Sequence, residues 1–139
     1  MRVLALFLLV IAATLPVQAQ EPSAEDAAAV EAVIRSQLDA FNRDDGVAAF
    51  GYAGPGIQAK FQSVETFMAM VRSGYGPVYR SAAAEFGALT PGDGRLIQEV
   101  VVTGQDGKAA LAVYLLARQA DGSWKIEGVS LQELPDLSV

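Results

Sequence analysis

Three groups of residues in this chain carry side chains that could bind or act on a small molecule. In the first, two phenols and a guanidinium lie within the run Tyr-Gly-Pro-Val-Tyr-Arg that ends at Arg80. Arginine offers a planar fork of donors that matches a carboxylate. At the mouth of a cavity, Tyr75, Tyr79 and Arg80 could therefore hold a carboxylate or another polar group. The alternative is that the tyrosines pack under a sheet and Arg80 pairs with Glu85 or Asp39.

The second group, Tyr52, Gln58 and Phe61, follows the first long helical segment of the sequence. A short helix at this place could close a pocket and aim the neutral amide of Gln58 inward, where it would act as donor and acceptor. The alternative is that Gln58 lies on the surface or bonds the nearby backbone, as most such side chains do.

The third group consists of Glu85, Glu99 and Tyr114, which are polar residues within predicted strands. A carboxylate base and a tyrosine that converge in an apolar cavity can move protons on a bound ligand. Tyr114 falls in an apolar strand, and Glu99 alternates with apolar neighbours, so it faces either inward or toward an edge. In the alternative interpretation, the hydroxyl of Tyr114 only bonds a neighbour.

Missing residue types exclude several kinds of site. Histidine and cysteine are absent from all 139 residues, so the chain has no Ser-His-Asp or Cys-His machinery and no disulfide. Zinc, haem and iron–sulfur sites built on those residues are excluded too. The net charge of -6 disfavours a nucleic-acid partner. No phosphate-binding or calcium-loop pattern is present, so we expect no cofactor and no metal.

The beginning of the chain has the layout of a secretory signal peptide. Met1-Arg2 is basic, Val3 to Ala13 is apolar, and small residues at Val17 and Ala19 suit a signal peptidase. The apolar run is shorter than the ~20 residues of a membrane span, although an uncleaved anchor is the alternative. We predict a periplasmic or secreted protein without a stable membrane span after cleavage. The predicted organisation is a signal peptide at 1–19, a flexible lead at 20–25, a single α+β domain at 26–134 and a tail at 135–139.

The elements that would position these groups change character near residue 80. Before it, apolar residues recur at spacings of three and four, which predicts a helix over 26–45 and another that begins after Ser63 and ends at Gly74 in a left-handed cap. Pro77 predicts that residues 75–79 run extended. After residue 80, the alternating pattern predicts strands at 82–89, 95–103, 108–119 and 123–133.

Two further features describe the expected sheet. The strand at 108–119 is apolar on both sides, so we expect it to be central and covered on both faces. Gly128 interrupts the alternation of the last strand and predicts a β-bulge there. Helices followed by an antiparallel meander predict an α+β fold, with N-terminal helices packed on a curved four-stranded antiparallel sheet, cone-like in shape.

This order of elements resembles the cystatin-like cone shared by nuclear transport factor 2, ketosteroid isomerase and the SnoaL-type cyclases. A more specific likeness lies in residues 53–80, which include Pro55-Gly56-Ile57-Gln58, Phe67-Met68-Ala69-Met70-Val71 and Pro77-Val78-Tyr79-Arg80. These motifs resemble an uncharacterised family of exported bacterial proteins, a domain-of-unknown-function family common in alphaproteobacteria. The likeness covers about residues 28–134 and implies the fold and export, but no activity.

We therefore predict a non-enzymatic exported module whose pocket binds a small apolar or carboxylate-bearing molecule, or whose sheet binds a protein. The candidate pocket residues are Tyr52, Gln58, Phe61, Tyr75, Tyr79, Arg80, Glu85 and Tyr114. The resemblance to ketosteroid isomerase implies a second hypothesis, a lyase or isomerase that uses Tyr114 or Tyr79 with Glu85 or Glu99. A third is an envelope assembly factor that forms a homodimer through an apolar sheet face. The residues expected on that face are Val100, Val102, Leu111 and Val113.

Overall fold

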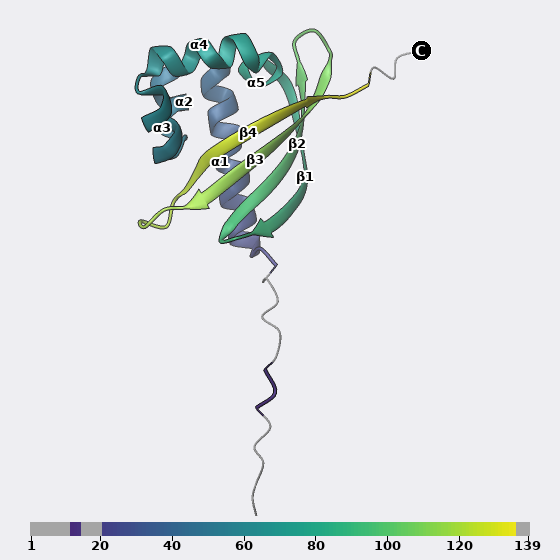
Figure 1. Cartoon of the computed structure of the whole chain (residues 1–139). Helices are drawn as coiled ribbons and strands as arrows, with labels where there is room; N and C mark the ends of the chain where they lie inside the picture. Colours follow the sequence, from purple (N-terminus) through teal and green to yellow (C-terminus); the bar gives the residue numbers. More distant parts are fainter. Residues whose placement is uncertain (1–11, 15–20, 136–139) are drawn as a thin grey trace, which may run out of the picture.

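The computed structural model describes residues 12–14 and 21–135. Its helices lie on one side of an antiparallel sheet (Figure 1). Nearly all of the predicted signal peptide, residues 1–19, lies outside these residues and stays a prediction, as does most of the predicted tail. Within the described ranges, no helix is both long enough and apolar enough to cross a membrane.

The first helix, α1 (Ala24–Asn42), begins where its capping pattern predicts. The hydroxyl of Ser23 accepts a hydrogen bond from the backbone N–H of Asp26 at 3.0 Å, which satisfies one of the free donors of the first turn. The side of α1 that faces the core carries Val30, Ile34, Gln37, Leu38, Ala40 and Phe41. The helix ends three residues before the expected Asp45, because Asp44 adopts a left-handed conformation with φ 55°.

Four short helices follow before the sheet begins: α2 (Gly46–Gly51), α3 (Pro55–Phe61), α4 (Val64–Gly74) and α5 (Gly76–Tyr79). Ser63 caps α4 as predicted, accepting a hydrogen bond from Thr66 N at 3.1 Å. The expectation of an extended segment over 75–79 is wrong. Pro77 lies in the first turn of α5, where its missing N–H leaves no helical hydrogen bond unmade. Gly74 ends α4 inside the helix and has no positive φ, so the predicted left-handed cap is absent.

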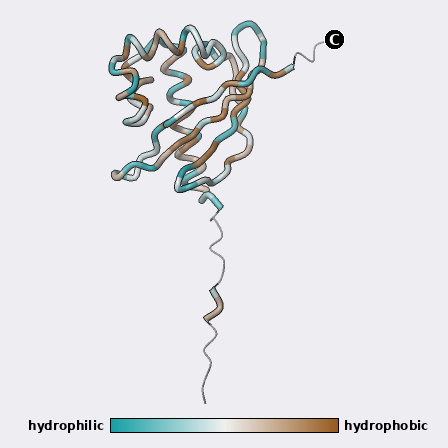
Figure 2. Tube along the Cα trace, viewed as in Figure 1, coloured by the Kyte–Doolittle hydropathy of each residue, from teal (hydrophilic) through white to brown (hydrophobic). Residues whose placement is uncertain are grey.

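The sheet contains β1 (Ser81–Gly92), β2 (Arg95–Gly104), β3 (Ala109–Arg118) and β4 (Trp124–Glu133), in that spatial order and with every neighbouring pair antiparallel. The predicted meander and the α+β class are confirmed. In Figure 2, long hydrophobic stretches run along the central strands, which is where the sheet meets the helices.

Only one face of the sheet is fully buried. The inner face, turned toward the helices, includes Val100, Val102, Ala110, Ala112, Tyr114 and Leu116. On β3, Leu111, Val113 and Leu115 alternate with these buried residues and are half-buried on the outer face. The expectation that β3 is covered on both faces is therefore wrong. Val100 and Val102 also lie on the inner face, opposite Ala112 and Ala110, and are not exposed as expected.

Bulges bend both edge strands. In β4, Leu115 pairs with Gly128 and Leu116 with Ile126, so Glu127 has no partner on β3 and the predicted bulge is confirmed. In β1, the register shifts between Phe86 and Leu89. The buried amide of Gln98 donates to the carbonyl oxygens of Gly87 and Ala88 there, at 3.1 and 3.3 Å.

Candidate ligand pocket

A pocket of about 540 Å³ lies between the helices and the bulge of β4. We call it the bulge pocket. Helices α1, α3, α4 and α5 and the edge strand β4 all contribute to its lining, as do Ala53, between α2 and α3, and Tyr75, between α4 and α5. The lining residues are Gln37, Phe41, Ala53, Gly56, Ile57, Lys60, Phe61, Phe67, Met70, Val71, Tyr75, Val78, Ile126, Glu127, Gly128 and Val129.

Aromatic rings form much of the apolar lining. The ring of Phe67 packs against Phe41 and Phe61, with centroids 6.0 Å apart in both pairs, and all three rings line the bulge pocket. Behind them, Phe50 packs on Phe67 at 5.0 Å. These separations are those of favourable tilted and edge-on aromatic contacts. The rings therefore hold one another in place around the cavity.

The wall of the pocket depends on a tie between two distant segments. Ala53 forms a parallel bridge with Ile126 on the free edge of β4. Gly54 N donates to Ile126 O at 2.7 Å, and Ile126 N donates to the backbone oxygen of Tyr52 at 2.9 Å. A Cβ at Gly54 would meet Ile126 O at 3.4 Å, which is an ordinary van der Waals contact, so the bridge itself does not require glycine at this position. The bridge fixes the start of α3 beside the bulge.

Gln37 is the buried polar residue of the lining. Its side chain belongs to the core-facing side of α1 and is 2 % exposed. The amide Nε2 donates to the backbone oxygen of Ala49 at 3.0 Å. Among the residues that the structure describes, no donor bonds Oε1 of Gln37, and this oxygen is not among the fully inaccessible unpaired atoms. The pocket thus contains a buried, available acceptor.

Two charged residues complete the lining. Glu127 pairs with Arg95, with a Nε–Oε2 distance of 2.8 Å, so its charge is already compensated. The ammonium of exposed Lys60 lies 5.4 Å from the ring centroid of Phe61 and forms no ion pair with any residue in the described part of the chain. The charge available to a ligand at this pocket is therefore positive.

Two of the eight predicted pocket residues, Phe61 and Tyr75, line the bulge pocket. The hydroxyl of Tyr75 donates to Val129 O at 3.1 Å, which ties the end of α4 to β4. Tyr52 and Gln58 lie close by but are not in the lining. Gln58 donates from Nε2 to Phe50 O and Ala53 O, at 3.0 and 3.1 Å. It therefore follows the alternative interpretation and joins α3 to the preceding backbone.

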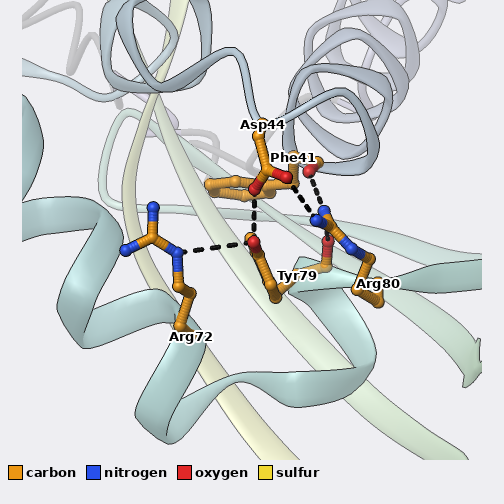
Figure 3. A network of polar contacts seen from close by, with 5 residues as sticks. All are labelled: Phe41, Asp44, Arg72, Tyr79 and Arg80. Carbon is orange, nitrogen blue, oxygen red and sulfur yellow. Dashed lines mark hydrogen bonds and ion pairs between the residues drawn. The ribbon is translucent and has the colours of Figure 1, made fainter.

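Tyr79 and Arg80 belong to a separate surface network that Figure 3 shows. Asp44 accepts a short hydrogen bond from the Tyr79 hydroxyl and another, at 2.5 Å, from Nη2 of Arg80. Arg80 also donates to the backbone oxygen of Phe41, and Arg72 reaches the Tyr79 hydroxyl at 3.4 Å. The hydrogen bonds from Tyr79 and Arg80 lower the pKa of the Asp44 carboxyl.

This network corrects the expected partner of Arg80. The sequence suggested Glu85 or Asp39, but Nη2 of Arg80 pairs with Asp44, and Nη1 donates to the backbone oxygen of Phe41. A carboxylate from the chain itself therefore already occupies the arrangement predicted for a ligand carboxylate. The network fastens the turn after α1 to α5.

Glu85 and Tyr114 lie on opposite faces of the sheet. Glu85 is exposed and pairs with Val101, whereas Tyr114 is 0 % exposed and faces the helices. Glu99 also lies on the outer face, opposite Val113. Tyr114 is outside the pocket lining, and its hydroxyl has no partner in the described part of the chain. Burial raises the pKa of the Tyr114 phenol. These carboxylates and Tyr114 do not converge.

Sequence reasoning missed Gln37, although the pattern contained it. Val30, Ile34, Gln37 and Phe41 follow one another at spacings of four, three and four, so they share one helix face. A glutamine within an apolar stripe must satisfy a buried amide, which marks it as structurally or functionally special. For metals, residues 12–14 and 21–135 contain no cluster of three acidic side chains that could bind an ion.

Comparison with known proteins identifies a family and no annotated relative. The family described as "Domain of unknown function (DUF4864)" matches the chain over residues 23–139, which is nearly the whole sequence after the predicted signal peptide. A search of curated proteins finds no match.

Proposed function

Since the chain belongs to the DUF4864 family, whose description assigns no activity, we propose from the bulge pocket that it is an exported protein that binds a small apolar molecule. The observation that carries this proposal is a cavity of about 540 Å³ with an apolar lining and one buried amide. Small-molecule sites commonly have volumes of roughly 300–1,000 Å³, apolar walls and a few placed polar groups.

The charge at the pocket extends the proposal to ligands with an acidic end. Lys60 supplies an uncompensated ammonium beside Phe61, while the carboxylate of Glu127 is engaged by Arg95. A ligand that keeps its carboxylate at the solvent side can pair with Lys60 without burying charge, which would be costly in an apolar site. An apolar molecule, with or without a carboxylate at that end, therefore suits the pocket.

The separation of the acidic and phenolic groups favours a binding role over proton-transfer catalysis. A general base must reach the proton that it removes, either directly or through one water. Glu85 and Glu99 lie on the outer face of the sheet and Tyr114 on the inner face, so Tyr114 does not share a cavity with either carboxylate. The hydroxyl of Tyr79 is engaged by Asp44. The fold order supports the resemblance to the cystatin-like cone only in architecture, which carries no activity by itself.

Calorimetry and native mass spectrometry with decanoic acid would test binding at the pocket. We expect saturable one-to-one binding to the wild-type protein. Ile57→Trp should weaken it, because Ile57 is half-buried in the lining and the larger indole takes up part of the cavity. The matched control is Val47→Trp, since Val47 is 75 % exposed and outside the lining. Equal binding by both variants would show that the ligand lies elsewhere.

Export is the second part of the proposal and rests on the sequence of residues 1–19. Protein purified from the periplasm or medium of its own host should begin at Gln20. The measurement is N-terminal sequencing together with the intact mass. An uncleaved chain retained in the membrane fraction would contradict this part and would support the anchor alternative.

A homodimer through the outer face of the sheet is a second candidate, favoured by a half-buried apolar row. The row consists of Ile97, Val101, Leu111, Val113 and Leu115. Multi-angle light scattering should give twice the monomer mass for the wild type and the monomer mass for Val113→Glu, because an unpaired charge at such an interface is costly. A wild-type monomer at high concentration would refute this candidate.

A further inference from the structure

The orientation of the Gln37 amide leads to an inference about the ligand, which rests on the proposed function of the bulge pocket. A backbone carbonyl can only accept a hydrogen bond, so the group that contacts Ala49 O must be the NH₂ of Gln37. This contact settles which way the amide points. The carbonyl oxygen, Oε1, is consequently directed away from Ala49.

The cavity is the place where that oxygen can find a donor. Gln37 is one of the lining residues, and among the described residues no donor reaches Oε1. The other polar side chains of the lining have different situations: the hydroxyl of Tyr75 donates to Val129 O, Glu127 pairs with Arg95, and Lys60 is exposed. Gln37 is therefore the buried polar contact that the lining offers to a molecule inside it.

The surroundings of Gln37 limit the kind of donor that can bind there. The pocket side chains contributed by α1 and α4 are apolar apart from Gln37, and they include Phe41, Phe67 and Val71, all buried. An ammonium or guanidinium could donate to Oε1, but burying its charge among these side chains would be strongly unfavourable. An ether or ester offers only acceptors. A hydroxyl or an amide N–H is neutral and can donate.

We propose that the bulge pocket selects an apolar molecule that carries a neutral hydrogen-bond donor, a hydroxyl or an amide N–H, at its buried end, and that Oε1 of Gln37 accepts this hydrogen bond. Gln37 is then a specificity residue of the pocket. Any carboxylate of the ligand lies at the other end, toward Lys60. Sites built to hydrogen-bond a ligand group discriminate against analogues that lack it, because the protein group is then left unpaired.

The test compares 1-octanol with heptyl methyl ether, which have the same formula but differ in that only the alcohol donates. Affinities of both are measured by calorimetry for the wild type and for Gln37→Met. The hydration of each molecule in water is the same whichever protein it binds. Comparing the octanol-to-ether affinity ratio of the wild type with that of Gln37→Met therefore isolates the contribution of the Gln37 side chain. We expect the octanol-to-ether affinity ratio to be roughly 3- to 10-fold larger for the wild type than for Gln37→Met, because one neutral hydrogen bond contributes about that much.

The matched control is Gln58→Met, because Gln58 is outside the lining and its amide bonds backbone oxygens of Phe50 and Ala53. This variant should keep the wild-type preference. If Gln37→Met does not fold, the side-chain carbonyl ¹³C resonance of Gln37 in the wild type gives the answer. It should shift on addition of octanol and stay in place on addition of the ether.

The possible outcomes separate the two proposals. Two results would overturn the assignment of Gln37 and leave the proposed function standing. One is that both molecules bind with the same relative preference in the wild type and Gln37→Met. The other is that octanol and the ether shift the Gln37 resonance equally. Failure of both molecules, and of decanoic acid, to bind the wild type overturns the proposed function and this inference with it.

Discussion

Tyr114 provides a sharp test of the packing of the core, because its hydroxyl is buried and has no partner in the part of the chain that the structure describes. The side chain is 0 % exposed, and its hydroxyl forms no hydrogen bond to any described residue. We predict that Tyr114→Phe raises the free energy of unfolding. The folded wild type bears the cost of removing a hydroxyl from water without replacing its hydrogen bonds, and the variant does not.

The magnitude follows from two opposing terms. An unsatisfied buried hydroxyl costs roughly 1–3 kcal/mol. Deleting it leaves a void of about 10–15 Å³, which costs only about 0.3 kcal/mol at roughly 24 cal/mol per Å³. The net gain is therefore about 0.7–2.7 kcal/mol, which corresponds to a rise in Tm of roughly 3 °C or more for a domain of this size.

Urea unfolding followed by fluorescence of Trp124, which is buried in the core, measures this change. Tyr75→Phe is the matched control of opposite sign. The hydroxyl of Tyr75 donates to Val129 O at 3.1 Å, so its removal should cost about 0.5–1.5 kcal/mol. Loss of stability in Tyr114→Phe comparable to that in Tyr75→Phe would refute the reasoning, because it would mean that the Tyr114 hydroxyl has a partner.

The same residue predicts how stability depends on alkaline pH. Burial raises the pKa of Tyr114 above its usual value of 10.0. Above pH ~10, an unfolded tyrosine therefore releases a proton that folded Tyr114 retains, and unfolding becomes more favourable as the pH rises. This one residue contributes a loss of up to about 1.4 kcal/mol per pH unit. Tyr114→Phe should lack that contribution, so the stability difference between the two proteins should widen above pH ~10.

Two further predictions concern the contacts around α2 and the turn before it. A Cβ at Gly46 would come within 2.7 Å of Val64 Cγ1 and 2.9 Å of Met68 Cγ. Gly46→Ala should therefore lower the free energy of unfolding, measured in urea, by about 1–3 kcal/mol. An unchanged unfolding midpoint would contradict the packing of α2 on α4. The lowered pKa of Asp44 means that the stabilisation from its interaction with Tyr79 is present above pH 3.8 and is lost as the pH falls through the lowered value. In Tyr79→Phe, NMR titration should show a higher pKa for Asp44. An unchanged pKa would count against the hydrogen bond.

Features that depend on a few neighbouring residues could be predicted from the sequence. Ser23 and Ser63 cap their helices because the capping bond spans three residues. Gly128 breaks a local alternation, and the bulge lies there. The segment around Pro77 was harder because proline has two local effects: it pushes the preceding residue out of the helical region, yet it suits the first turn of a helix. Here the second effect decides, and α5 forms.

Features that depend on distant segments could not be predicted in the same way. Asp44 is a better partner for Arg80 than Glu85 or Asp39 only because α5 packs beside the turn after α1. Similarly, alternation separates the two faces of β2 and β3, but it does not say which face the helices cover. Both faces of β3 are apolar, and the helices select the face that carries Tyr114. One wall of the bulge pocket likewise forms where Ala53 reaches Ile126, which is distant in the sequence.

The bridge between Ala53 and Ile126 also means that the pocket is completed by the last strand of the chain. The helices are made first, and β4, which supplies the facing wall, is the last strand to be synthesised. A nascent chain that stops before β4 has the hydrophobic side chains of the cavity but no enclosure for them, and such exposed surfaces favour misassembly. In the proposed function, the ligand consequently stabilises only finished molecules.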